Sequence, residues 1–334
     1  MTSRTTIPSA ARVTVNFTDL VQRQHAFTTQ DAAASVPQSH RMPMHLPGAA
    51  RIRAREIREA DLPAVADLLT RGFGSRPLRF WLRLLACLAG RSVPAELPRY
   101  GYLLEGDGAI VGAILLIFST LQRDGTDAIR CNVSSWYVDA GFRGYASLLV
   151  SKALSHPNVT YLNITPAPHT LPLVEAQGYS QYSKGIFVAA LALQFRSTGR
   201  HGSVVPAESH APAKAEGLEH EMLLEHADYG CVSLWCETDA GAYPFVFRPR
   251  FVRGVIACAQ LVYCRDIDDF VRCAGPIGRF LAWRGRPLVL IDSNGPIPGL
   301  IGRYLDDKMP KYFKGPNRPR LGDLAYTEAA MFGI

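Results

Sequence analysis

The stretch Val133–Leu154, VSSWYVDAGFRGYASLLVSKAL, decides how the rest of the chain is interpreted. Before its turn, side chains alternate over Ile129–Val138 and include β-branched and aromatic residues, which is typical of a strand. After the turn, apolar residues recur at helical spacing as far as Ala153, and Pro157 favours an end to the helix just before it. The sequence therefore predicts a strand, a turn and a helix.

The turn between them, Asp139–Gly144, ends in an Arg-Gly pair directly before the helix. The first amides of a helix lack intrahelical partners and carry the positive end of its dipole. Such a turn is suited to binding an anion, and Arg143 adds a positive charge beside it.

The combination V-D-x-x-F-R-G followed by an amphipathic helix resembles the acetyl-CoA-binding motif of the GNAT (GCN5-related N-acetyltransferase) superfamily. In that family an Arg/Gln-x-x-Gly-x-Gly/Ala turn holds the coenzyme pyrophosphate. With Arg143 first, the two small positions fall on Ala146 and Leu148. Shifted by two, Gly144 and Ala146 fit, but Gly141 replaces the Arg/Gln. Either register predicts a looser phosphate loop, because Cβ atoms limit how closely the backbone approaches phosphate.

The resemblance implies that the co-substrate is acetyl-CoA or another acyl-CoA. The pyrophosphate would bind the Arg143 side chain and the amides of the turn, and the pantetheine arm would lie between two diverging strands. The implied coenzyme-binding residues are Ser134, Trp136, Val138, Arg143, Gly144, Tyr145, Ala146, Ser147, Leu148 and Asn163.

The tyrosine that many relatives use as general acid falls on Val174 here, and the central strand carries no carboxylate base. Another group must then handle protons. The candidates are His169, in a proline-containing loop, and Tyr179 and Tyr182 shortly after the next helix. His169 could instead cap that helix or pack against a neighbouring proline.

The order of elements in the first half is strand, helix, helix, strand, strand, strand, helix, strand, which is the GNAT order. Gly106-Asp107-Gly108 favours a tight hairpin turn within it. The helix Pro77–Leu88 carries Phe80 and Trp81, which either pack in the core or line the acceptor pocket. The sequence thus predicts an α/β fold with a mixed sheet, and a GNAT-like acyl-CoA-binding domain over residues 50–195.

Residues 1–49 are polar and aperiodic, and predict a disordered leader. Residues 196–217 are rich in small residues and proline, and predict a flexible linker. Residues 218–334 predict a second, truncated and degenerate GNAT-like domain. Its expected elements include a helix Asp266–Arg284, interrupted near Gly275-Pro276, and a helix Leu300–Lys308.

The second half has no Arg-x-x-Gly-x-Gly/Ala turn, and Asp266, Asp268 and Asp269 stand where a phosphate would lie. We therefore expect no coenzyme there. The basic stretch Tyr304–Arg320 predicts either a solvated surface or a lid that contacts an acidic substrate.

The composition is that of a chain able to bury a core, with 48% hydrophobic and 19% charged residues. A net charge of +7 favours anionic partners such as a nucleotide cofactor, but no lysine-rich run indicates nucleic acid. Seven cysteines without Cys-x-x-Cys spacing indicate buried, reduced thiols in a cytoplasmic protein and no metal site. The longest apolar run, Ala109–Phe118, is too short to span a bilayer.

Three functional hypotheses follow. The first is an acyl-CoA-dependent N-acyltransferase, in which a small-molecule or peptide amine, or less often a hydroxyl, attacks the thioester directly. The second is a non-catalytic GNAT pair that binds a ligand or partner, which Val174 and Leu148 favour. The third is an aminoacyl-tRNA-dependent transferase, which only the net positive charge favours.

Overall fold

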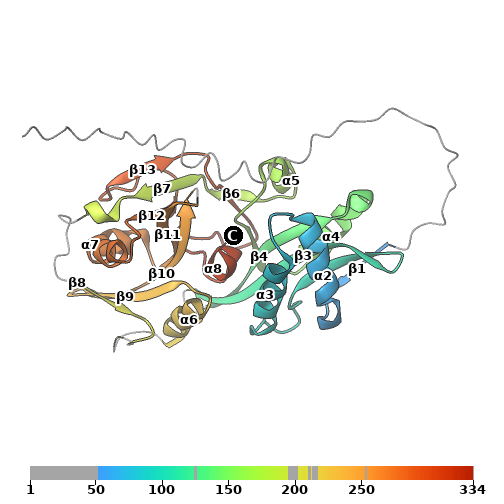
Figure 1. Cartoon of the computed structure of the whole chain (residues 1–334), viewed down its shortest axis with the longest axis horizontal. Coiled ribbons are helices and arrows are strands. Elements are labelled where there is room, and N and C mark those ends of the chain that lie inside the picture. Colours follow the sequence, from blue (N-terminus) through green and yellow to red (C-terminus); the bar gives the residue numbers. More distant parts are fainter. Residues whose placement is uncertain are drawn as a thin grey trace, which may run out of the picture.

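The computed structural model describes residues 52–123, 126–194, 202–209, 212, 217–252 and 254–333. Two mixed sheets of seven strands each form the fold, with helices packed on their faces (Figure 1). The predicted α/β class with two related halves is confirmed. The predicted leader, residues 1–49, lies outside the described residues.

Strand β4, which leads into the Asp139–Gly144 turn, lies at the centre of the first sheet. Only β4 and β5 run parallel, and all other neighbouring strands are antiparallel. The spatial order is β1 (Ile52–Glu56), β2 (Gly101–Gly106), β3 (Ala109–Arg123), β4 (Thr126–Val138), β5 (Val159–Asn163), β14 (Lys311–Lys314) and β6 (Ser180–Ser183).

The turn between β2 and β3 consists of Asp107 and Gly108, at the position that the sequence predicts. Their φ angles are 51° and 83°. Two-residue hairpin turns favour this left-handed region, which glycine and aspartate adopt more readily than other residues. The turn fixes the register of β3, and β3 in turn pairs with β4 along nearly its whole length.

Helices cover both faces of the first sheet. On one face pack α2 (Leu62–Gly72) and α3 (Leu78–Ala89), which bury Leu68, Leu69 and Trp81 against β2 and β3. On the other face lie α4 (Ala146–Ala153) and α5 (Leu171–Ala176). The burial of Trp81 therefore fits core packing, while Phe80 stays half-buried beside it.

The second sheet has one large helix, α7 (Ile267–Trp283), on one face and α6 (Gly217–Asp228) on the other. Its strands lie in the spatial order β13 (Gly302–Leu305), β7 (Gly185–Ala189), β12 (Leu288–Ser293), β11 (Ile256–Cys264), β10 (Gly241–Val252), β9 (Val232–Thr238) and β8 (Gly202–Pro206). The second half thus contributes to a sheet of the same size as the first.

Three sequence-based expectations for the second half and the segment before it are wrong. The helix α7 is continuous through Pro276, whose ring faces Gly202 of β8, where a side chain would clash. The segment expected as a helix at Leu300–Lys308 contains strand β13, because it pairs with β7. The range expected as a linker contains β8, which pairs with β9. In each case a contact with another element determines the secondary structure, and the local sequence pattern alone predicts it wrongly.

The two halves exchange one strand each. Strand β7 follows β6 directly in the chain, yet it joins the second sheet between β13 and β12. Strand β14 comes from the end of the chain, yet it fills the first sheet between β5 and β6. The two sheets are consequently tied together by their own strands.

The C-terminal segment, residues 320–333, lies between the two sheets and ends in α8 (Glu328–Phe332) (Figure 1). Asp323 forms a buried ion pair with Arg130 of β4 at 3.2 Å. The buried imidazole of His226 accepts a hydrogen bond from the Tyr326 amide at 3.0 Å. These contacts fix α8 beside β4.

Candidate functional site

The predicted coenzyme turn is an exposed surface at the start of α4. A 3₁₀ helix, η3 (Ala140–Tyr145), leads from β4 into α4. The side chains along the turn are exposed, and a Cβ added to Gly141 or Gly144 would meet no atom within 4 Å. The exposed residues are Arg143, Gly144, Tyr145, Ser147 and Leu148, while Ala146 is half-buried.

Two residues, Phe142 and Asp139, attach the turn to the rest of the first half. The Phe142 ring packs in the apolar cluster of the first sheet and lies over Gly106. The Asp139 amide donates to the Val111 carbonyl at 2.8 Å, and the Asp139 carboxylate pairs with Arg71 at 3.4 Å. Asp139 therefore ties the turn to β3 and to the end of α2, and Arg71 adds a second arginine next to the turn.

Beside the turn, β4 and β5 separate and form a fork. They pair in parallel from Ile129 opposite Val159 to Asn132 opposite Leu162. Beyond that point β4 continues along β3, while β5 ends at Asn163 and pairs with β14. The amides of β4 that face away from β3 are thus left without a strand partner in the fork.

An irregularity in β4 lies in this fork. The register with β3 shifts between Leu115 and Ala113, and Ser135 adopts a φ of 47°. A non-glycine residue in this region costs about 1–3 kcal/mol, and such strain concentrates at functional sites. The shift leaves Trp136 packed toward α4 and Tyr137 toward α2 and α3.

The carboxylate of Glu328, from α8, bridges the two arms of the fork. Ser134 Oγ on β4 donates to one carboxylate oxygen, and Thr165 Oγ1 beyond β5 donates to the other. The Glu328 amide donates to Asn132 Oδ1 at 2.7 Å, and Asn132 Nδ2 reaches the Leu162 carbonyl. A carboxyl group from the end of the chain therefore lies where the two strands part.

The surroundings of Glu328 suit proton exchange. Its side chain is buried, and burial raises the pKa of the carboxyl group, although the hydroxyls of Ser134 and Thr165 oppose the rise. Thr165 is exposed, so it connects the buried carboxyl group to the surface. A carboxyl group with a raised pKa that contacts hydroxyl groups can act as a proton acceptor or donor.

The predicted pantetheine residues lie along the fork. Ser134 and Val138 are buried, Asn163 and Trp136 are half-buried, and the Trp136 indole nitrogen has no hydrogen-bond partner among the described residues. Their role toward a coenzyme stays a prediction.

The three predicted proton-handling residues do not form one group. His169 is exposed, in the 3₁₀ helix η4 (Pro168–Thr170). Tyr179 is buried in the cluster under α4, and Tyr182 is buried in a different cluster, next to α6 and α8. Burial raises the pKa of both phenols, which keeps them protonated. Their catalytic roles stay predictions, and His169 is the most accessible of the three.

Sequence reasoning missed Glu328, Thr165 and Arg71. Glu328 is separated from Ser134 by 194 residues, and no motif surrounds it. The only signal available for Arg71 was its place in the last turn of the first helix. Long-range placement, which a single sequence does not reveal, brings these groups together.

The basic stretch predicted as a solvated surface or a lid is instead largely built into the fold. Lys311 is buried and pairs with Asp292 at 2.7 Å, and Lys314 donates to the Gln177 carbonyl at 2.7 Å. Arg320 donates to the Arg265 carbonyl. These side chains join β14 to its surroundings, which corrects the lid hypothesis for them.

The helix of the second half that corresponds to α4 is α7, and its N-terminus is capped from within the chain. Asp266 is the N-cap, and its carboxylate accepts from the Asp268 amide at 2.8 Å. An anion at this helix would meet these carboxylates, in contrast to the open turn before α4.

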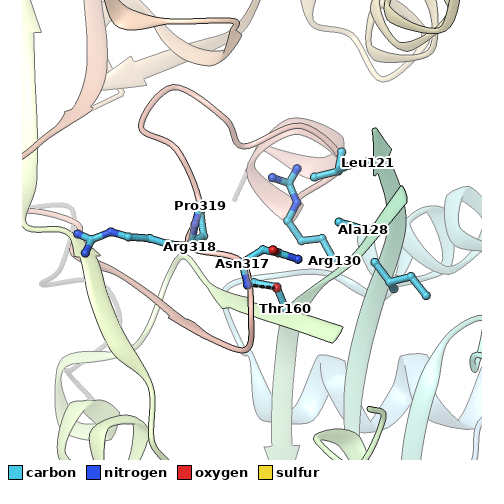
Figure 2. A pocket seen from close by; sticks show the side chains of 8 residues that line it. Leu121, Ala128, Arg130, Thr160, Asn317, Arg318 and Pro319 are labelled. Carbon is cyan, nitrogen blue, oxygen red and sulfur yellow. Dashed lines mark hydrogen bonds between the residues drawn. The ribbon is translucent and has the colours of Figure 1, made fainter. Parts of the chain in front are cut away.

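A small hollow lies away from the fork, near the paired beginnings of β4 and β5 (Figure 2). Its volume is about 40 Å³, well below the range of roughly 300–1,000 Å³ usual for small-molecule sites. The Asn317 amide closes one side by donating to Thr160 Oγ1 at 3.1 Å. This hollow is therefore smaller than the usual site for a small molecule.

Among the described residues, no cluster of three or more His, Cys, Asp or Glu could hold a metal ion. None of the seven cysteines forms a disulfide, and six of them are buried. In the described part of the chain, no helix combines the length and apolar character needed to cross a membrane.

The sequence matches no protein-family model and no curated protein. Solved structures do resemble the fold. A probable N-acyltransferase of unknown function from Enterococcus faecalis V583 is 12% identical, with a TM-score of 0.50 over 82% of this chain and 74% of that one. A GCN5-related N-acetyltransferase from Kribbella flavida is 13% identical, with a TM-score of 0.49 over 79% and 71%. Eis1 from Mycobacterium abscessus is 11% identical, with a TM-score of 0.47 over 82% and 74%.

At these identities the similarity concerns the fold. The chain therefore shares the fold of the probable N-acyltransferase from Enterococcus faecalis V583, and that fold contains two mixed sheets of seven strands each.

Proposed function

We propose that this protein transfers an acyl group from acyl-CoA to an amine. The observation that carries the proposal is the combination of an exposed, arginine-bearing turn before α4 with a strand fork that contains a buried carboxyl group. The turn offers amides and positive charge to a pyrophosphate, and the fork offers unpaired backbone to an amide-containing arm.

In the proposed reaction, the amine nitrogen attacks the thioester carbonyl carbon. The C–N bond forms, the C–S bond breaks, and the coenzyme leaves as a thiolate that takes up a proton. The attacking nitrogen releases a proton, which Glu328 receives through the hydroxyl of Ser134 or Thr165. His169 is an alternative proton carrier, because its exposed ring lies on the loop that follows Thr165.

The first test is coenzyme binding by the full chain, measured by calorimetry. Arg143→Glu should weaken the binding of acetyl-CoA at least tenfold, because it reverses a charge beside the pyrophosphate, and the loss should be greater at low salt. Arg279→Glu, on the exposed face of α7, is the matched control and should change little.

Equal affinity in Arg143→Glu and the wild-type protein would reject the turn as the coenzyme site. Binding without turnover, for every amine tested, would favour the alternative of a non-catalytic ligand-binding protein. Val174 supports that alternative, because a buried valine stands where relatives often carry the acid.

A further inference from the structure

The second sheet carries an exposed apolar surface at one end. Among the described residues, five large hydrophobic side chains are more exposed than any other, with exposed fractions of 49–88%, whereas the next reaches 45%. These five residues are Leu193, Phe251, Val255, Trp283 and Ile301. Each lies at or beside the end of an element that belongs to this sheet or packs on it. We call the five residues the apolar end.

The strand registers place three of these residues together. Phe251 lies opposite Ala257 near the start of β11, and Val255 lies in the turn that joins β10 to β11. Strands β11 and β12 are parallel, so both begin at this end of the sheet. The helix α7 follows β11 and precedes β12, so it runs back to the end where β12 begins, and its last residue is Trp283.

Backbone hydrogen bonds hold the other two residues at the same place. Strand β7 is antiparallel to β12, so β7 ends beside the first residues of β12. The 3₁₀ helix η5 (Leu191–Leu193) follows, and its Ala192 amide donates to the Pro287 carbonyl, just before β12, at 3.4 Å. The Ile301 carbonyl accepts from the Ala190 amide at 2.8 Å. All five residues therefore lie at one end of the second sheet.

The apolar end is directed away from the first half. The opposite ends of β7 and β12 join the first sheet, because β7 follows β6 in the chain and Asn294, just after β12, donates to the Tyr182 carbonyl of β6 at 3.0 Å. The helix α7 and the helices α2, α3 and α4 lie at opposite sides of the molecule (Figure 1). A partner at the apolar end therefore leaves the coenzyme turn before α4 uncovered.

Arginines flank the apolar end. Arg284 follows Trp283, is exposed, and stacks on the Phe280 ring at 3.6 Å. Arg303 follows Ile301 by two residues and is also exposed. Within the described part of the chain, neither arginine forms an ion pair. The sequence has no Asp or Glu in the segments of this end, residues 190–194, 251–257, 279–289 and 300–303.

This combination fits a lipid surface better than a protein partner. Trp283 and Val255 protrude from a helix end and a turn, so they present a convex surface. A second copy of the chain, docked through the same end, would bring further arginines and no carboxylate from these segments. Exposed tryptophan and aliphatic side chains enter the headgroup region of a bilayer, and arginines beside them are attracted to anionic lipids.

We propose that the apolar end docks the protein on the surface of a bilayer that contains anionic lipids. Trp283, Val255 and their neighbours enter the headgroup region, while Arg284 and Arg303 lie against the lipid phosphates. The protein rests on the bilayer in this arrangement and does not cross it. The inference is independent of the proposed acyl transfer, because it uses none of the residues of the coenzyme turn or the fork.

The test is co-sedimentation of the full chain with lipid vesicles. One set of vesicles contains phosphatidylcholine alone, and the other contains equal amounts of phosphatidylcholine and phosphatidylserine. The wild-type protein should bind the mixed vesicles roughly tenfold more tightly, because the arginines are attracted to the anionic lipid. High salt should reduce this difference, because it screens the charges.

Trp283→Ala should weaken binding to the mixed vesicles roughly tenfold, because it removes apolar surface that the lipid would bury. Leu82→Ala, exposed on α3, is the matched control and should keep the affinity. Arg284→Glu should also weaken binding roughly tenfold, whereas Arg83→Glu, exposed on α3, changes the net charge equally and should lose little. If Trp283→Ala folds poorly, Val255→Ser repeats the test on a separate element.

A wild-type protein that does not bind the mixed vesicles would overturn the proposal, as would equal binding by a folded Trp283→Ala variant. Equal losses in Arg284→Glu and Arg83→Glu would show that only net charge acts, and would reject the apolar end as the docking surface. Binding of poly-glutamate without binding of vesicles would identify an acidic protein as the partner instead.

Sedimentation of the free protein tests for a second copy as the occupant. A mass that rises with concentration in the wild-type protein, but not in Trp283→Ala, would identify self-association and overturn the proposal. The affinity for acetyl-CoA should be the same in Trp283→Ala and the wild-type protein. Absence of acetyl-CoA binding would reject the proposed function alone, and it is measured without vesicles.

Discussion

Glu328 is the single residue on which the proposed chemistry depends most. Glu328→Gln keeps the size of the side chain but removes its ability to take a proton, and turnover should fall by about 10²–10⁴. The affinity for acyl-CoA should stay nearly constant, so the effect should appear in kcat. Glu221→Gln, exposed on α6, is the control.

The amide of Glu328→Gln can accept only one of the two hydroxyl hydrogen bonds, so the melting temperature must be measured beside the rate. A variant that is folded and still turns over at the wild-type rate would show that Glu328 only holds the fork together.

His226 makes the stability of the C-terminal segment depend on pH. Its Nδ1 donates to the Met222 carbonyl at 2.7 Å, and its Nε2 accepts from the Tyr326 amide, so the ring is neutral. Burial lowers the pKa of His226 from 6.5 to about 4. The unfolded chain therefore binds this proton more readily, and the stabilisation that is present above pH 6.5 is lost as the pH falls toward 4.

The wild-type protein should lose about 2 kcal/mol of unfolding free energy from this residue between pH 7 and pH 5. Urea denaturation at the two pH values measures the loss. His226→Gln, which cannot titrate, should be less stable at pH 7 but should lose correspondingly less on acidification. An equal pH dependence in both proteins would contradict the assignment.

At the scale of elements, β14 depends on a buried ion pair. Lys311 on β14 in the first sheet pairs with Asp292 on β12 in the second, and both side chains are almost fully buried. Asp292→Asn leaves the ammonium group without a counter-charge and should destabilise the fold by about 3–5 kcal/mol.

The double variant Lys311→Met with Asp292→Leu removes both charges and should recover most of that loss, because an apolar pair avoids desolvation. Equilibrium denaturation compares the three proteins. If the double variant is as unstable as Asp292→Asn, the ion pair is not the cause of the loss.

At the scale of the whole molecule, the sequence predicts what local patterns determine. The Asp107-Gly108 turn and the helix after Arg143 both follow from short-range spacing. The strand exchange does not follow from local patterns, because the sequence of β7 predicts a buried strand whichever sheet the strand joins. Glu328 was missed for the same reason, since its partners are distant in sequence.

The strand exchange has a consequence for the order in which the molecule can be completed on the ribosome. Translation produces β7 before any other strand of the second sheet, and it produces β14 after every other strand of the first. The early-made β7 must therefore wait for neighbours, while the first sheet keeps an open gap between β5 and β6 until residues 311–314 emerge. The second sheet can close once β13 has been made, but the first sheet cannot close before β14 emerges. The nascent chain therefore exposes the unpaired edges of β5 and β6, which chaperones commonly shield, until β14 arrives.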